Sequence, residues 1–285
     1  MNKPQVEAVS SEIDEAVPLL TSNEMATFVN QGYLRFDEIV PKDLCAETLE
    51  FLTGPSASFK SYEGTRTVSE GWPGTPLSKV FAIPKIRGVV ESLVGPEPWV
   101  DGQHMHVVAP HAGGQGLHQD YERKPFRYRF RVLLSFFFHD VPEEMGGTAF
   151  LPGSHLRRMD RFTNPGRYHH ITGMLPCVCK AGTMFIWHWN VWHKARANHT
   201  DQPRYMYKVF LHPRVRQRST WDTRDLDDPE IGKILTRPQP WHGGEGRLEG
   251  LKRIELWRYL TGDREKRVEW QPLDQYPNDR EFDQL

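Results

Sequence analysis

The sequence predicts a β-rich α+β fold in which helical segments flank a core of short strands. Between residues 95 and 213, segments rich in β-branched and aromatic residues alternate with turns marked by glycine and proline. No long helical pattern separates these segments, which favours a sandwich or barrel over a doubly wound parallel sheet. Helical periodicity instead precedes and follows this region. The 285 residues are enough to bury a sizeable core.

The N-terminal part is predicted to be mainly helical. Residues 1–20 show no steady apolar period and are expected to extend flexibly into solvent. Thr21 and Glu24 have the spacing of a capping box, so a helix should begin there and end at Gly32. The segments expected next are a strand at 33–40, a helix between Pro41 and Gly54, a loop at 55–76 and a helix at 77–93.

The central region should supply the strands of the core. They are expected at 98–109, 128–140, 147–151, 174–179, 183–188 and 204–212. Helical patterns return at 229–236 and 249–260. We interpret residues 214–285 as a helical flap packed on a β-core of about 98–213, so that 21–285 form a single domain.

Composition excludes several classes of function. Lys+Arg 36 and Asp+Glu 37 give a formal charge of −1, which provides no bulk positive field for nucleic acid or an anionic membrane. The apolar stretches are shorter than the ~18–20 residues that cross a bilayer, and the N-terminus lacks a signal-peptide core. Cys45, Cys177 and Cys179 are expected to be reduced core thiols, with half of a metal site at CxC as the minority interpretation. We expect a cytoplasmic protein that binds small molecules. The sequence leaves its oligomeric state open.

Three residues are candidate metal ligands. His118 and Asp120 lie two positions apart, so on an extended chain both side chains can reach one metal ion. This triplet alone carries little information, because residues 199–201 read HTD and form a second example. His193 follows a strand-like run and adds a third ligand. Two histidines and one carboxylate on one face of a metal leave open positions, as in non-haem Fe(II) oxygenases.

A candidate anion clamp follows the third ligand. Arg204 opens the strand-like segment RYMYKVFL, shortly after His193. A guanidinium at this place could hold the far carboxylate of a dicarboxylate through two parallel hydrogen bonds.

At these residues the sequence resembles the phytanoyl-CoA dioxygenase family of Fe(II)/2-oxoglutarate oxygenases. The motifs are HQD, GGTAFLPGSH and GTMFIWHWNVWH with a later arginine, and the resemblance covers residues 102–213. It implies a double-stranded β-helix, a cupin-like jelly roll with the metal between its sheets. It also implies that iron is ligated by His118, Asp120 and His193.

The resemblance extends to the co-substrate pocket. Arg204 would hold the C5 carboxylate of 2-oxoglutarate, while Gln103 and Ser135 match positions that contact the co-substrate or line its pocket. The family often has a hydroxyl two residues after the distal histidine, where this chain has Ala195. The missing hydrogen bond could then come from Thr148 or Ser135.

The implied function is an Fe(II)/2-oxoglutarate-dependent dioxygenase, an oxidoreductase. It would use O₂ to hydroxylate a small organic metabolite at an unactivated C–H bond and release succinate and CO₂, with ascorbate helpful in vitro. Hydroxylation is favoured because Asp120 is present, whereas halogenating relatives replace that ligand by a small residue. Two alternatives stay open. One is a zinc metallohydrolase or isomerase on the same three residues, and the other is a jelly-roll binding protein without turnover.

Other polar and aromatic residues permit two interpretations. His104 and His106 are more typical of satisfied core or rim groups than of ligands, although His106 could contact the pocket. The aromatic cluster around His188 is more typical of packing than of a substrate cage. The basic run within 123–131 fits a solvated strand edge, and an anionic substrate would also explain it.

Overall fold

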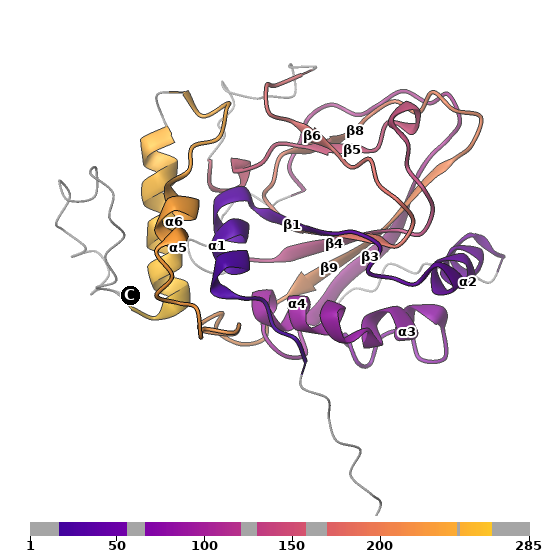
Figure 1. The fold of residues 1–285 in the computed structure, drawn as a ribbon. Helices are drawn as coiled ribbons and strands as arrows, with labels where there is room; N and C mark the ends of the chain where they lie inside the picture. The colour runs from indigo at the N-terminus through magenta and orange to yellow at the C-terminus, as the bar shows by residue number, and fades with distance from the viewer. Residues whose placement is uncertain (1–16, 56–65, 121–129, 158–169, 244–245, 264–285) are drawn as a thin grey trace, which may run out of the picture.

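The computed structural model describes residues 17–55, 66–120, 130–157, 170–243 and 246–263, and shows two antiparallel sheets with helices packed around the larger one (Figure 1). The expectations for residues 1–16, for the basic residues 123–129 and for the end of the flap at 264–285 lie outside these described residues. None of the helices described is long and apolar enough to cross a membrane.

The larger sheet has six strands in the order β1-β7-β4-β9-β3-β2. The bounds are β1 Tyr33–Phe36, β2 Arg66–Thr67, β3 Trp99–Val108, β4 Val132–Phe137, β7 Thr183–His188 and β9 Arg204–His212. The smaller sheet has the order β6-β5-β8. Its strands are β5 Thr148–Phe150, β6 Leu175–Pro176 and β8 His193–Ala195. This confirms the predicted fold class, a β-rich α+β protein with flanking helices.

Alternation along the strands gives the larger sheet two different faces. The outer face, which includes Leu134 and Val209, belongs to the main hydrophobic core shared with the helices. The inner face, which includes Leu133 and Met206, packs with Phe150 of the smaller sheet. Side chains on the inner face therefore point into the space between the two sheets.

Helices cover the outer face and one end of the larger sheet. Their bounds are α1 Ser22–Gln31, α2 Lys42–Thr53, α3 Pro76–Ala82, α4 Pro84–Val94, α5 Glu230–Thr236 and α6 Gly246–Thr261, with 3₁₀ turns η1 Glu143–Met145 and η2 Ser154–Leu156. Figure 1 shows α1 beside α5 and α6, contacts that join the N-terminal helix to the C-terminal flap. The capping box is confirmed. The Thr21 hydroxyl accepts from the Glu24 N–H, and the Thr21 N–H donates to the Glu24 carboxylate.

The structure differs from the sequence prediction at several element boundaries. The helix expected at 77–93 is two helices, because Pro84 has no N–H to donate and holds Ile83 in an extended conformation. Strand β2 lies within the expected loop at 55–76, and β8 is too short to show a sequence pattern. Strand β6 keeps only two residues of the predicted 174–179, and β1 stops at Phe36.

Candidate metal centre and co-substrate pocket

His118, Asp120 and His193 meet beside the smaller sheet. The two histidines pair through their backbones, each N–H donating to the other's carbonyl at 2.9 Å. The His118 Nε2 lies 3.6 Å from Asp120 Oδ1, and the His193 Nε2 lies 3.5 Å from Asp120 Oδ2. All three ligand atoms fall within 4.8 Å of one another. Metal–ligand distances of about 2.0–2.2 Å span ligand atoms up to about 4.4 Å apart, so one ion can bridge each of the two His–Asp pairs at their present spacing.

Hydrogen bonds set the tautomers of both histidines. The His118 Nδ1–H donates to the Gly116 carbonyl at 2.8 Å, and the His193 Nδ1–H donates to the Val191 carbonyl at 3.0 Å. Because a carbonyl only accepts, each Nδ1 carries the proton and each Nε2 presents its lone pair to the shared centre. The His193 ring also stacks on Trp187, with 5.8 Å between centroids.

Two atoms of this cluster are buried and unsatisfied. Asp120 Oδ2 and His193 Nε2 have no hydrogen-bond partner among the residues that the structure describes. Buried polar atoms left without a partner are costly, and a divalent cation would satisfy both. Two imidazoles and one carboxylate are also a donor set that iron(II) and zinc accept. The residues present therefore fit a metal ion.

The electrostatics of the cluster suit a cation. Burial opposes ionisation of Asp120, but His193, followed by Lys208 and His118, outweighs it and holds the pKa of this carboxyl well below its usual range. Burial lowers the pKa of His118. An ionised carboxylate beside a neutral imidazole is the protonation state that metal binding requires.

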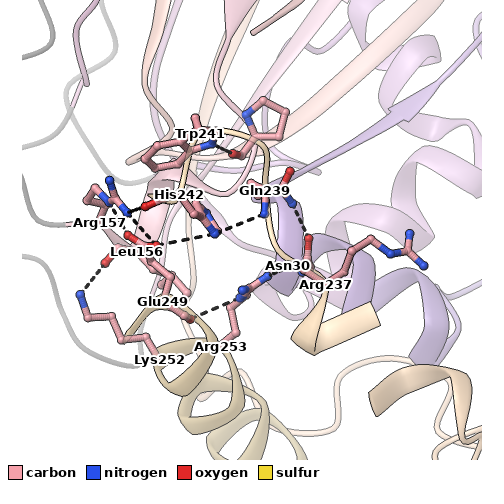
Figure 2. A network of polar contacts seen from close by, with 11 residues as sticks. Asn30, Leu156, Arg157, Arg237, Gln239, Trp241, His242, Glu249, Lys252 and Arg253 are labelled. Carbon is pink, nitrogen blue, oxygen red and sulfur yellow. Dashed lines mark hydrogen bonds and ion pairs between the residues drawn. The ribbon is translucent and has the colours of Figure 1, made fainter. Parts of the chain in front are cut away.

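The PGSH turn at residues 152–155 supports the strand of the distal histidine. The Ser154 hydroxyl accepts from the Trp192 N–H at 2.9 Å, and the Leu151 N–H donates to the Trp192 carbonyl at 2.8 Å. The C-terminal segment also holds this turn, because Trp241, labelled in Figure 2, donates from Nε1 to the Pro152 carbonyl at 2.7 Å. The turn thus connects the flap to the residue preceding His193.

Arg204 lies at the start of β9 and is only 1% exposed. Its Nη1 donates to the Met145 carbonyl at 2.5 Å and to the Arg196 carbonyl at 3.2 Å. Its Nη2 is buried and has no partner within the described part of the chain. Burial lowers the pKa of Arg204 to about 10, so the group stays charged at neutral pH. One end of the guanidinium is therefore hydrogen-bonded to the backbone, and the other has no partner among the described residues.

Ser135 and Thr148 face the same inter-sheet space from opposite sheets. The Ser135 hydroxyl is buried and has no partner among the residues described. The Thr148 hydroxyl donates to the Met206 thioether at 3.5 Å, two residues from Arg204. Thr148 also lies directly opposite Ala195 in the β5–β8 ladder. It therefore brings a hydroxyl beside the position that lacks one.

The structure does not bring Gln103 to this pocket. Gln103 pairs with Val209 on the outer face of β3, and its Oε1 accepts from Trp72 Nε1 and from the Tyr207 hydroxyl. These bonds tie β3 and β9 to the segment before α3. The resemblance placed Gln103 on the correct strand, β3, but on the wrong face of the sheet. Successive side chains of a strand point to opposite faces, so a shift of one residue changes the face.

Lys208 is a charged residue beside the candidate metal centre that the sequence analysis missed. It lies on β9 opposite His104 and Ser135, and its side chain is 7% exposed. The Lys208 Nζ is 3.9 Å from Asp120 Oδ2. Burial lowers the pKa of Lys208, and Asp120 acts in the opposite direction. The sequence contained a signal for Lys208. Because Arg204 and Lys208 are four residues apart on one predicted strand, their side chains must point to the same face of the sheet.

The remaining histidines divide by sheet face. His104 and His106 lie on the inner face, and burial followed by the charge of Lys208 lowers their pKa values, to about 4 for His106. His188 is buried near the helices, where its Nδ1 accepts from the Asn190 N–H at 3.0 Å. Burial lowers the pKa of His188 to about 3. Its burial agrees with the interpretation of the aromatic cluster around it as packing.

The sequence profile of the phytanoyl-CoA dioxygenase family matches residues 28–206, a span that contains the whole His-Asp-His cluster and Arg204. This chain belongs to the phytanoyl-CoA dioxygenase family. Two curated relatives, the uncharacterised proteins Rv1501 of Mycobacterium tuberculosis and Mb1539 of Mycobacterium bovis, are each 23% identical over 129 residues. Those residues are 43% of this chain and 46% of each relative, so the match spans about half the length of the relatives.

Several solved structures share the fold of this family member. The epimerase SnoN in complex with Fe³⁺, α-ketoglutarate and nogalamycin RO has a TM-score of 0.51 at 19% identity, over 67% of this chain and 84% of its own. EctD from S. alaskensis with 2-oxoglutarate and 5-hydroxyectoine has a TM-score of 0.52 at 17% identity, over 74% and 81%. AviO1 from Streptomyces viridochromogenes has a TM-score of 0.51 at 14% identity, over 68% and 96%. The common fold is that of cupin-like, 2-oxoglutarate-dependent enzymes.

Proposed function

We propose that this protein is an Fe(II)- and 2-oxoglutarate-dependent dioxygenase that hydroxylates a small organic molecule at an unactivated C–H bond, with release of succinate and CO₂. One observation carries the proposal. The candidate ligand atoms of His118, Asp120 and His193 gather at one place, and Arg204 has a guanidinium end without a partner among the described residues. Bound iron with 2-oxoglutarate would supply O₂ activation and an oxidative decarboxylation that drives C–H cleavage.

Each pocket residue then has a defined task. His118, Asp120 and His193 would ligate the iron through the three atoms that already face one another. The free Nη2 of Arg204 would bind the C5 carboxylate of 2-oxoglutarate by a charge-assisted hydrogen bond, while Nη1 stays on the Met145 carbonyl. Because that carbonyl already orients the guanidinium, little side-chain freedom is lost when the dicarboxylate binds.

Two hydroxyls would complete the co-substrate site. Ser135 has an unsatisfied buried oxygen, and Thr148 lies opposite Ala195 with only a thioether as acceptor. Both can donate to a carboxylate or keto oxygen between the sheets. This arrangement replaces the hydroxyl that Ala195 cannot provide.

The two histidine sides of the candidate metal centre differ in their exposure to solvent. Trp187 and Phe150, both buried, pack around His193, which is itself only 4% exposed at its side chain. The His118 side chain is 38% exposed, so the centre opens to solvent on that side. We therefore assign substrate entry to the His118 side and the dry wall to the His193 side. SnoN and EctD, whose structures contain nogalamycin RO and 5-hydroxyectoine, support a small-molecule substrate.

The conversion of 2-oxoglutarate to succinate in the absence of a primary substrate, called uncoupled turnover, tests the proposal. The protein supplied with Fe(II), 2-oxoglutarate and ascorbate should release succinate slowly, and His118→Ala and Asp120→Ala should abolish this release because each removes a ligand. The second HxD triplet provides the control, since His199→Ala should turn over like the wild type. Equal succinate from the wild type and both ligand variants would refute the assignment.

Anaerobic spectroscopy separates the iron oxygenase from a zinc hydrolase on the same residues. Fe(II) and 2-oxoglutarate together should produce an absorption band at about 500 nm, as expected for a bidentate chelate on iron. Zinc has a filled d shell and gives no such band. Catalysis of a hydrolytic reaction by the zinc form, without this band in the iron form, would favour the hydrolase.

A further inference from the structure

Lys208 is a largely buried lysine whose only ion pair among the described residues is a long one. Its side chain is 93% buried, yet no hydrogen bond links it to any of the residues that the structure describes. Its nearest opposite charge, Asp120 Oδ2, is 3.9 Å from Nζ, which is longer than a hydrogen bond. Nζ does not belong to the fully buried, unpartnered atoms of the described residues, so its three donors remain accessible to an acceptor beside Asp120. The site is therefore incomplete around Lys208.

The charge balance of the pocket points to a missing anion. Among the described residues on the inner side, Asp120 offsets one of the two cations, Arg204 and Lys208. Burial raises the pKa of the Cys177 thiol well above its usual value, so this neighbour is neutral. A divalent metal and the 2-oxoglutarate dianion cancel each other. Among the described residues, one positive charge then remains without a counter-charge.

The two cations occupy different places along the strand. Arg204 and Lys208 are four residues apart, roughly 13 Å at the rise of a β-strand. Lys208 is the one beside the metal ligand Asp120, and Arg204 is held by the Met145 carbonyl. They therefore define two separate anion positions, one at the far end of the co-substrate and one next to the metal.

Two neutral imidazoles share the wall of the second position. His104 pairs directly with Lys208 in the β3–β9 ladder, and His106 is the next inward residue of β3. Neither ring has a hydrogen-bond partner among the residues described. A neutral imidazole offers one N–H donor, which suits a carboxylate already held by a cation. The wall thus combines one charge with two neutral donors.

We propose that Lys208, with His104 and His106 beside it, binds a carboxylate of the primary substrate next to the metal. This inference rests on the proposed function and adds the class of substrate, a small molecule with one carboxylate near the carbon that reacts. The same carboxylate chemistry could come from the C1 end of 2-oxoglutarate. The charge balance favours the substrate, because the metal already offsets the co-substrate.

Binding of matched acids and amides tests the inference without turnover. The protein is loaded with Zn(II) and saturated with 2-oxoglutarate, and calorimetry follows the binding of acetate, butanoate and benzoate and of the corresponding primary amides. A buried charge-assisted contact should make at least one acid bind about tenfold or more tightly than its amide. Lys208→Met should abolish this preference and Lys208→Arg should keep it. If Lys208→Met does not fold, Lys208→Gln takes its place in the same experiment and should also abolish the preference.

Two controls separate the possible failures. Lys233→Met removes an exposed lysine of α5 and should leave the preference unchanged. In a second arm, 2-oxoglutarate itself is titrated into the Zn(II) forms, and its affinity should fall in Arg204→Met but change less than about threefold in Lys208→Met. A tenfold loss in Lys208→Met would overturn the inference and assign the cation to the co-substrate, leaving the proposed function intact. An absent acid preference, or one that survives in Lys208→Met, would also overturn it.

Discussion

At the scale of single residues, two side chains of the candidate site each have one nitrogen hydrogen-bonded to the backbone and a second nitrogen without a hydrogen-bond partner among the described residues. Arg204 donates from Nη1 to two backbone carbonyls, whereas its Nη2 has no partner in the described part of the chain. His193 donates from Nδ1 to a carbonyl, and its Nε2 faces Asp120. In both cases the backbone fixes the direction of the group before any ligand binds. Pre-orientation of this kind explains why a small change next to Arg204 should affect binding.

Gly146 is such a position. It has φ +87, and a Cβ there would lie 2.1 Å from the Ala197 carbonyl oxygen and 3.0 Å from Arg204 Nη1. Gly146→Ala should therefore lower the free energy of unfolding by about 2 kcal/mol or more and weaken 2-oxoglutarate binding. Urea unfolding and calorimetry measure the two effects. The control is Gly74→Ala, which has φ +72 but open space around the new methyl. It should lose some stability and no affinity, and equal affinity losses in both variants would contradict the prediction.

The arginine itself is predicted to resist conservative replacement. Arg204→Lys retains a positive charge but cannot hold the Met145 carbonyl and a carboxylate through one planar group. We expect 2-oxoglutarate to bind at least about tenfold more weakly while the metal content stays unchanged. Calorimetry and metal analysis test this. An unchanged affinity for 2-oxoglutarate would show that a residue other than Arg204 binds its C5 carboxylate.

At the scale of elements, the C-terminal flap holds the PGSH turn through a buried polar network (Figure 2). Arg157, just after the turn, forms a bidentate pair with Glu249 of α6 and also donates to the His242 carbonyl. Lys252, one turn along α6, donates to the Leu156 carbonyl at 3.1 Å. Because the turn also holds Trp192, the helix stabilises the segment that carries the distal histidine.

Breaking this pair should cost more than breaking a surface pair. The Glu249 and Arg157 side chains are 4% and 17% exposed, so Glu249→Gln replaces a buried carboxylate by a neutral amide and weakens its bidentate contact with Arg157. We expect a loss of about 3 kcal/mol in the free energy of unfolding. Glu230→Gln, which breaks the exposed pair with Lys233, should cost less than about 1 kcal/mol. Similar losses in the two variants, measured by urea unfolding, would show that the network contributes little.

At the scale of the whole molecule, stability should depend on pH through three buried histidines. Burial lowers the pKa of His188 to about 3 and of His242 to about 4, and holds that of His155 well below its usual value. In the unfolded chain these groups protonate near pH 6.5. Between about pH 6.5 and pH 4 the unfolded state therefore binds more protons than the folded state, and stability falls as the pH is lowered.

His188 allows a direct test of this dependence. Each histidine that is neutral when folded and charged when unfolded adds up to about 1.4 kcal/mol per pH unit to the slope. His188→Gln should flatten the curve of unfolding free energy against pH by up to that amount between pH 6 and pH 4.5. His111→Gln, at an exposed histidine, should leave the slope unchanged. A slope that is the same in all three proteins would exclude His188 as a source.

Much of the fold and site could be predicted because the relevant signals are local or ordered along the chain. The capping box at Thr21 and the proline that opens α2 depend on neighbouring residues, and the structure has both helices where expected. The three candidate ligands stood out because two lie at i and i+2 and the third follows a strand-like run. Strand β8 and the break at Pro84 were missed, the first because three residues show no period.

By itself, the sequence determined where most strands lie along the chain, the residue types at the candidate metal centre and the family to which the chain belongs. Tertiary structure decided which side chains face the pocket. Gln103 turns outward to Trp72 and Tyr207, whereas Lys208 turns inward to Asp120. The physical reason is that successive side chains of a strand point to opposite faces, so the function of each depends on how the neighbouring strands and the second sheet are packed.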